Sequence, residues 1–130
     1  MNQEELKQRT KAFAVRIVRL VEALPPTTVG RTFANQIVRS GTSVAANYRA
    51  ACRSRSKAEF AAKLGIVIEE ADETAFWLEM IIEAGIVPKD RIDSLLQEAN
   101  ELVAIFVSSR KTVSSSLKSN HKSSIDNRRS

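Results

Sequence analysis

The chain has 130 residues, a length typical of one domain, and 43% of them are hydrophobic, as in ordinary globular proteins. Its net charge is +5. No apolar run reaches the roughly 18 residues of a membrane-spanning helix. The polar N-terminus also lacks the architecture of a signal peptide. We therefore expect a cytoplasmic protein that is neither disordered throughout nor embedded in a membrane.

Four stretches of the sequence carry apolar residues at helical spacing. The first is predicted over residues 3–24 and ends at two prolines, which lack an amide donor. The second begins near residue 30 or 31, the third covers residues 56–85, and the fourth runs from residue 88 to about residue 110. Short connections between long amphipathic helices predict an all-α, antiparallel up-down-up-down four-helix bundle over residues 1–110.

Three local features refine this prediction. The segment from Ser56 to Glu59 has the pattern of a capping box, which starts a helix. Residues 40–43, Ser-Gly-Thr-Ser, interrupt the second helix and indicate a kink, two short helices, a close approach by another helix, or only a tolerated weak point. Thr74 falls within the apolar seam of the third helix and needs a backbone carbonyl partner if it is buried.

Residues 111–130 lack periodicity and are rich in Ser, Lys and Arg. This composition predicts a disordered tail. The only histidine, His121, lies in this segment. The tail either adds non-specific affinity for nucleic acid or only keeps the protein soluble.

The sequence contains no catalytic, cofactor or metal signature. One cysteine and one histidine exclude zinc sites built from these residues, and the glycine-rich phosphate loops are absent. Cys52 is expected to be a small buried hydrophobe or, with arginines nearby, a reactive thiol. Glu69 and Glu73 either share a hard cation or form an acidic surface. Trp77 is either an apolar anchor or a base-stacking platform. We predict a non-enzymatic protein without a cofactor.

Charge divides sharply along the chain. Residues 31–63 contain seven Lys and Arg against one Glu, a net charge of +6, whereas residues 64–110 have a net charge of −7. The basic segment either contacts phosphates, or pairs with acidic helices within or between subunits, or is an ordinary solvated surface.

The strongest basic cluster lies between a helix end and the next helix start, at one pole of the bundle. A helix N-terminus there would add free amides for an anion. Phosphate contacts are therefore predicted for eight residues, Arg39, Asn47, Tyr48, Arg49, Arg53, Arg55, Lys57 and Lys63.

Three segments carry a resemblance to a known family: RSGTSVAANY at residues 39–48, SKAEFAAKL at residues 56–64, and EEADETAFWL at residues 69–78. They resemble the four-helix-bundle proteins encoded within intervening sequences of 23S ribosomal RNA genes, over about residues 5–108. Family members often have Glu-Ala where this chain has Ala50-Ala51. This chain therefore lacks one acidic residue in its basic segment.

The resemblance implies an antiparallel four-helix bundle that assembles into a homopentamer. The chain is also similar to the accessory protein of diversity-generating retroelements, a pentameric barrel that engages nucleic acid and a reverse transcriptase. By this resemblance the expected partners are further copies of the chain and structured ribosomal RNA or another nucleic acid. The alternative is a protein–protein interaction or structural adaptor module without nucleic-acid binding.

Overall fold

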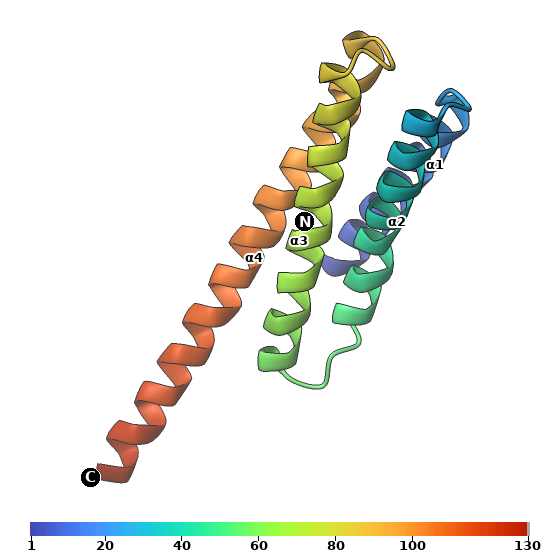
Figure 1. Ribbon diagram of the computed structural model, residues 1–130. Coiled ribbons are helices and arrows are strands. Elements are labelled where there is room, and N and C mark those ends of the chain that lie inside the picture. The colour runs from blue at the N-terminus through green and yellow to red at the C-terminus, as the bar shows by residue number, and fades with distance from the viewer. Residues whose placement is uncertain (130) are drawn as a thin grey trace.

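The computed structural model describes the backbone of residues 1–129 and the side chains of residues 1–118. Its four helices alternate in direction (Figure 1). They are α1 (Gln3–Ala23), α2 (Thr28–Ala51), α3 (Lys57–Glu83) and α4 (Lys89–Arg129). The predicted all-α four-helix bundle is confirmed. None of these helices, over the described residues, combines the length and the apolarity needed to cross a lipid bilayer.

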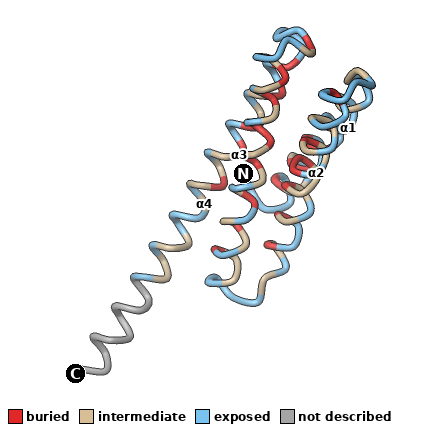
Figure 2. The backbone as a smooth tube through the Cα atoms, in the orientation of Figure 1, coloured by how far each residue is buried: buried red, intermediate tan, exposed pale blue. Residues whose placement is uncertain are grey.

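Neighbouring helices in the chain pack along their lengths, α1 on α2, α2 on α3 and α3 on α4, whereas the contact between α1 and α4 is small. Helices α1 and α3 lie diagonally across the bundle, as do α2 and α4. The buried residues follow the inward side of each helix (Figure 2). The largest fully buried side chains are Phe13, Phe106, Ile17, Ile37, Leu64, Leu78, Ile81, Ile92 and Leu102.

Side-chain caps determine where α2 and α3 begin. Thr27 accepts a hydrogen bond of 3.0 Å from the amide of Gly30, so α2 starts at Thr28, before the predicted start near residue 30 or 31. Ser56 accepts one of 3.1 Å from the amide of Glu59, as the capping-box pattern predicted. The Glu59 carboxylate reaches back 3.4 Å to the amide of Arg55, one residue before the expected position.

Glycine ends α3 because the chain must adopt a left-handed conformation there. Gly85 has a φ of +67°. The amide of Ile86 donates 3.1 Å to the carbonyl of Ile81, and that of Gly85 donates 3.0 Å to Ile82. These bonds form a Schellman motif, which satisfies carbonyls at the end of the helix. The sequence predicted Pro88 as the first residue of the fourth helix. In the structure α4 begins one residue later, at Lys89.

The Ser-Gly-Thr-Ser segment lies within one uninterrupted α2, so the expectation of two short helices is wrong. Small residues here allow neighbouring helices to approach. A Cβ atom at Gly41 would lie 2.9 Å from both Cγ1 and Cγ2 of Ile17 on α1. On the α3 side, the hydroxyl of buried Ser40 lies 2.9 Å from that of Thr74. The Thr74 hydroxyl also lies 2.7 Å from the carbonyl of Glu70, the backbone partner that its burial requires.

Replacing Gly41 by alanine is therefore expected to lower the free energy of unfolding by about 1–2 kcal/mol, because overpacking against Ile17 outweighs the higher helix propensity of alanine. Gly65→Ala is the matched control, since its Cβ would lie 3.4 Å from the guanidinium at the end of the Arg110 side chain. The control is expected to be neutral or stabilising by up to about 1 kcal/mol. Urea denaturation measures both effects, and a Gly41→Ala variant as stable as wild type would contradict the packing argument.

A two-pronged ion pair joins α1 to α4 where their contact is otherwise small. Arg9 Nε donates a hydrogen bond of 2.8 Å to Glu98 Oε2, and Arg9 Nη2 donates one of 2.5 Å to Glu98 Oε1. The same guanidinium lies 3.2 Å from Glu101. The hydrogen bond from Arg9 lowers the pKa of Glu98, although burial of the carboxylate opposes this effect. The pair thus keeps Glu98 ionised while it closes the bundle.

Helix α4 continues beyond Arg110, where the sequence predicted its end. Residues 111–118 are helical, so the disorder expected for them is wrong. Neither glycine nor proline occurs after Pro88 to stop the helix, and half-buried Val113 and Leu117 extend its apolar spacing. The rest of the expected tail, residues 119–130 with His121, lies outside the residues whose side chains are described.

Candidate nucleic-acid interface

The predicted contact residues do not form one cluster. Arg39 lies between α2 and α3, where its guanidinium is 3.2 Å from Glu70 and also pairs with Glu73. Both acids belong to the acidic half of the sequence. The pairing of basic and acidic helices that was one sequence alternative therefore occurs within the bundle at Arg39, and this cation is already neutralised.

Tyr48 is not at the surface, and its assignment as a contact residue is wrong. The residue is 3% exposed and its ring packs 5.4 Å from that of Phe106 between centroids. Burial raises the pKa of Tyr48, and its hydrogen bond with Cys52 raises it further. The helical period already placed Tyr48 one turn after buried Val44, on the core side of the helix. Asn47 is half-buried and donates 2.9 Å to the carbonyl of Ser43, one turn earlier in α2.

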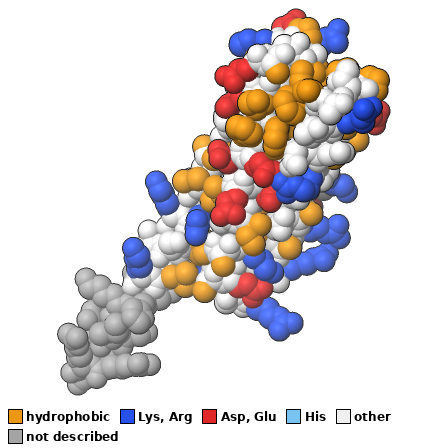
Figure 3. Space-filling model, viewed as in Figure 1, with side chains coloured by type: hydrophobic (Ala, Val, Ile, Leu, Met, Phe, Trp, Pro, Cys, Tyr) orange, Lys and Arg blue, Asp and Glu red, His pale blue; other side chains and the backbone are white. Residues whose placement is uncertain are grey.

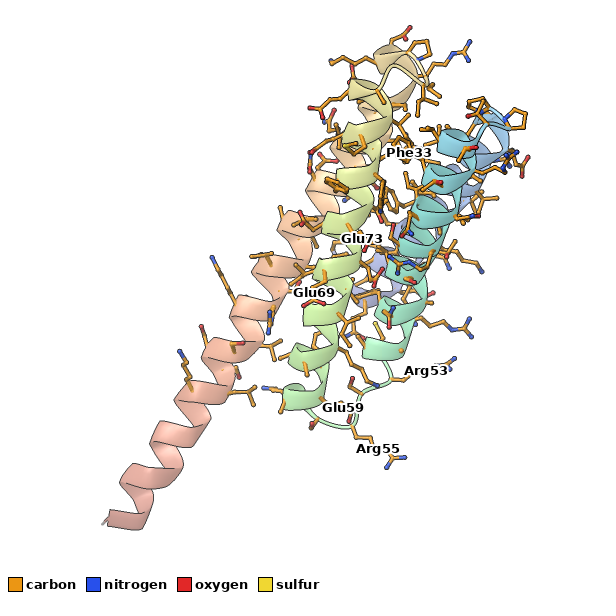
Figure 4. The ribbon with its side chains drawn as sticks, in the orientation of Figure 1. Phe33, Arg53, Arg55, Glu59, Glu69 and Glu73 are labelled. Atoms are coloured by element: carbon orange, nitrogen blue, oxygen red, sulfur yellow. The ribbon has the colours of Figure 1, made fainter. Side chains whose placement is uncertain are left out.

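At the pole of the bundle, three predicted cations lie around the start of α3. Arg55 is exposed in the α2–α3 connection and projects away from the bundle (Figure 4). Lys57 donates 3.1 Å to Ser116 of α4, and Lys63 pairs with Glu59 at 3.0 Å. The side chains of Ser56 and Glu59 cap this helix start, so the expected free amides for an anion are partly occupied.

A basic groove runs between the first half of α1 and the last turns of α2. Its volume is about 540 Å³, and small side chains of Thr42, Ala45 and Ala46 form part of its lining. Four cations border it: Lys7 and Lys11 from α1, Arg49 from the last turn of α2, and Arg53 from the turn that follows α2. Glu4 and Gln8 complete the lining. Lys and Arg side chains line the α2 edge of the molecule in Figure 3.

Three of the four cations in the basic groove have no carboxylate partner. Among the described residues, Lys11, Arg49 and Arg53 form no ion pair, whereas Lys7 lies 3.1 Å from Glu4. The groove can therefore attract an anion without first breaking ion pairs at these three positions. This property distinguishes it from the surroundings of Arg39 and Lys63.

Sequence analysis missed Lys7 and Lys11. The available signal was their separation by four residues, which places both on one face of a helix. The charge count set them aside because residues 1–30 have a net charge of only +2. Their position beside Arg49 and Arg53 depends on antiparallel packing of α1 on α2, which brings residues about forty positions apart to one groove.

A second surface lies between α2 and α3, nearer the opposite end of the bundle. We call Phe33, Phe76 and Trp77 the aromatic face. The Trp77 ring lies 5.5 Å from that of Phe33 and 5.0 Å from that of Phe76, between centroids. Phe76 is 48% exposed, and buried Trp77 Nε1 has no hydrogen-bond partner in the described part of the chain. Hydrophobic side chains gather over this part of α2 and α3 in Figure 3.

The described side chains offer no metal site, since no group of three or more His, Cys, Asp and Glu among them could hold an ion. Glu73 is paired with Arg39, which favours an acidic surface over a shared cation. Cys52 is half-buried and packs against the core as a free thiol. These residues form no arrangement to which a catalytic step can be assigned.

Comparison with known proteins agrees with this fold. Residues 2–108 match the protein family described as "23S rRNA-intervening sequence protein". The crystal structure of a protein of unknown function from the S23 ribosomal protein family of Bacteroides thetaiotaomicron is similar, with a TM-score of 0.79 and 35% sequence identity. The similarity covers 85% of this chain and 99% of that one. No curated protein matches the chain. The chain therefore belongs to the 23S rRNA-intervening sequence protein family.

Proposed function

We propose that this protein is a non-enzymatic, homo-oligomeric bundle of the cytoplasm that binds structured RNA through its phosphates. The observation that carries the proposal is the pair Arg49 and Arg53, two exposed guanidinium groups in one groove that no carboxylate of the described chain neutralises. Arginine is well suited to phosphate because its planar donors match two oxygens at once. The family description supports RNA as the nucleic acid.

Self-association would strengthen such binding. A pentamer, the assembly that the sequence resemblance implies, would have a net charge of about +25, five times that of one chain. Several copies of the basic groove on one body would also engage one RNA molecule together, which raises overall affinity without any new kind of contact.

Replacing Arg49, Arg53 and Arg55 together by alanine is expected to weaken binding of a structured ribosomal RNA fragment by about tenfold to a hundredfold at low salt. All three side chains are exposed, so their removal leaves the core intact. Fluorescence anisotropy measures the affinity, and circular dichroism checks the helical content. Duplex DNA serves as competitor, because a preference for RNA is part of the proposal.

The matched control is Arg16→Ala with Arg19→Ala and Arg31→Ala, which removes three exposed arginines outside the groove and the pole. This variant has the same net charge as the test variant, so a specific interface is expected to distinguish them. Equal loss of RNA affinity in the test variant and the control variant would mean that only the net charge of the protein matters. Unchanged RNA affinity in the test variant would show that Arg49, Arg53 and Arg55 do not contact the RNA.

A second candidate function, an adaptor that contacts only proteins, is favoured by the aromatic face. Exposed Phe76 beside Trp77, with its unpartnered indole nitrogen, resembles an incomplete interface. The occupant we propose is a second copy of the chain, because the exposed carboxylate of Glu69 on α3 complements the basic groove of another copy. Under this function, the triple-arginine variant changes the mass in solution and RNA binding is absent throughout.

A further inference from the structure

We infer that the basic groove between α1 and α2 is the path of one phosphodiester strand of a double helix, with Lys7 and Lys11 of α1 as contact residues. This inference rests on the proposed binding of structured RNA. Of the basic cluster that sequence analysis placed at the pole where α3 begins, it keeps Arg49 and Arg53 and leaves out Arg55 and Lys57. It also adds a helix that sequence analysis did not assign to the interface.

The spacing of the four cations supports a strand as the ligand. Arg49 lies in the last turn of α2, and Arg53 is two residues past the end of that helix at Ala51. Lys7 and Lys11 are one turn apart on α1, so they are separated by about 6 Å along the helix axis. This separation is close to that of neighbouring phosphates along a nucleic-acid strand. The two pairs border opposite sides of one groove, which suits a continuous chain of anions better than a single small ion.

The floor of the groove supports close approach of the ligand. Ala45 and Ala46 are small, and the floor has no apolar bulk that a sugar–phosphate chain would need to displace. Cations on both sides can therefore reach phosphate oxygens with extended side chains. Lysine and arginine also keep their aliphatic stems against the helices while their charged ends point outward.

The absence of aromatic side chains from the groove decides the class of ligand. Proteins that bind single strands without sequence preference stack bases on aromatic rings. None of the residues lining the groove is aromatic. Tyr48 is buried, and Phe76 and Trp77 lie on the aromatic face between α2 and α3. The groove therefore recognises only the backbone, and a double helix presents that backbone with its bases already stacked and paired.

Glu4 acts as an internal competitor for the phosphate. Its carboxylate lies 3.1 Å from Lys7 Nζ at the edge of the groove, and this contact lowers the pKa of Glu4. A phosphate that reaches Lys7 must displace this carboxylate and also approach its negative charge. Removing the charge at Glu4 is therefore expected to strengthen binding, a gain that general loss of structure cannot produce.

The test compares three double variants by anisotropy titration with a labelled RNA duplex and with a single strand of the same length. Lys7→Ala with Lys11→Ala is expected to weaken duplex binding about tenfold and to reduce the salt slope by about two, one for each lost phosphate contact. Arg49→Ala with Arg53→Ala is expected to do at least the same. Lys89→Ala with Arg91→Ala, a control that removes two exposed cations outside the groove, is expected to bind like wild type.

The single variant Glu4→Gln is expected to bind the duplex about two- to threefold more tightly at low salt, as removal of one nearby like charge predicts. Wild-type affinity in the Lys7 and Lys11 variant, with weakened binding in the Arg49 and Arg53 variant, would overturn the inference and leave the proposed function standing. Preference of wild type for the single strand would overturn the ligand class. Lack of any binding by wild type would instead refute the proposed function.

Discussion

Raising the concentration of monovalent salt from about 50 to about 200 mM is expected to weaken duplex RNA binding by about a hundredfold. Each neutralised phosphate contributes a slope of about −0.9 to the dependence of log affinity on log salt. The basic groove has four cations, Lys7, Lys11, Arg49 and Arg53, and one phosphate for each gives a slope between about −3 and −4. A series of anisotropy titrations at increasing salt measures this slope directly.

The same series distinguishes one groove from several. A slope much steeper than about −4 would indicate that more than one groove engages each duplex, as an oligomer would allow. An affinity that changes less than about threefold over this range would contradict phosphate recognition by the groove. Circular dichroism at each salt concentration is the control, because the core is apolar and the helices are expected to persist.

The second large effect concerns the core. Phe106→Ala is expected to lower the free energy of unfolding by about 3–5 kcal/mol, because it removes a fully buried ring and leaves a cavity. Phe106 packs against Tyr48 of α2 from its place on α4, so the cavity would lie where these two helices meet the core. Urea denaturation followed by circular dichroism gives the difference from wild type.

Phe76→Ala is the matched control for this substitution. It removes the same ring from a position that is 48% exposed, and it is expected to change the stability of one chain by no more than about 0.5 kcal/mol. Equal destabilisation by both substitutions would contradict the core described here. If the aromatic face docks a second copy, Phe76→Ala is also expected to reduce the mass of the assembly in solution. Phe106→Ala is expected to leave that mass unchanged under conditions in which the variant is folded.

Helix number, helix type and most helix ends follow from the sequence alone. Periodic apolar residues, Pro25 and Pro26 after α1, the capping box at Ser56 and the glycine at residue 85 are local signals, and each acts within a few residues of its own position. The end of α4 was predicted less well. Ser, Lys and Arg in residues 111–118 suggested disorder, but the helical spacing of Val113 and Leu117 continues there.

The candidate site depends on tertiary structure, because charge and distance between helices are not local properties. Helical periodicity was sufficient to place the Tyr48 side chain in the core, where the structure has it. The prediction that Tyr48 contacts nucleic acid relied instead on the basic residues next to it in the sequence. Arg39 looked equivalent to Arg49 in the sequence. Because α2 packs on α3, Arg39 forms ion pairs with acidic residues of α3. Because α2 packs on α1, Arg49 instead lies beside the lysines of α1.

By itself, therefore, the sequence determined that the chain is an all-helical bundle with a basic second helix and an acidic third helix. Only the tertiary structure decided which cations remain without a partner and which lie together. The physical reason is that ion pairing requires contact within about 4 Å. Such contacts are made between residues far apart in the chain, and the bundle brings Lys7 and Lys11 to one groove with Arg49 and Arg53.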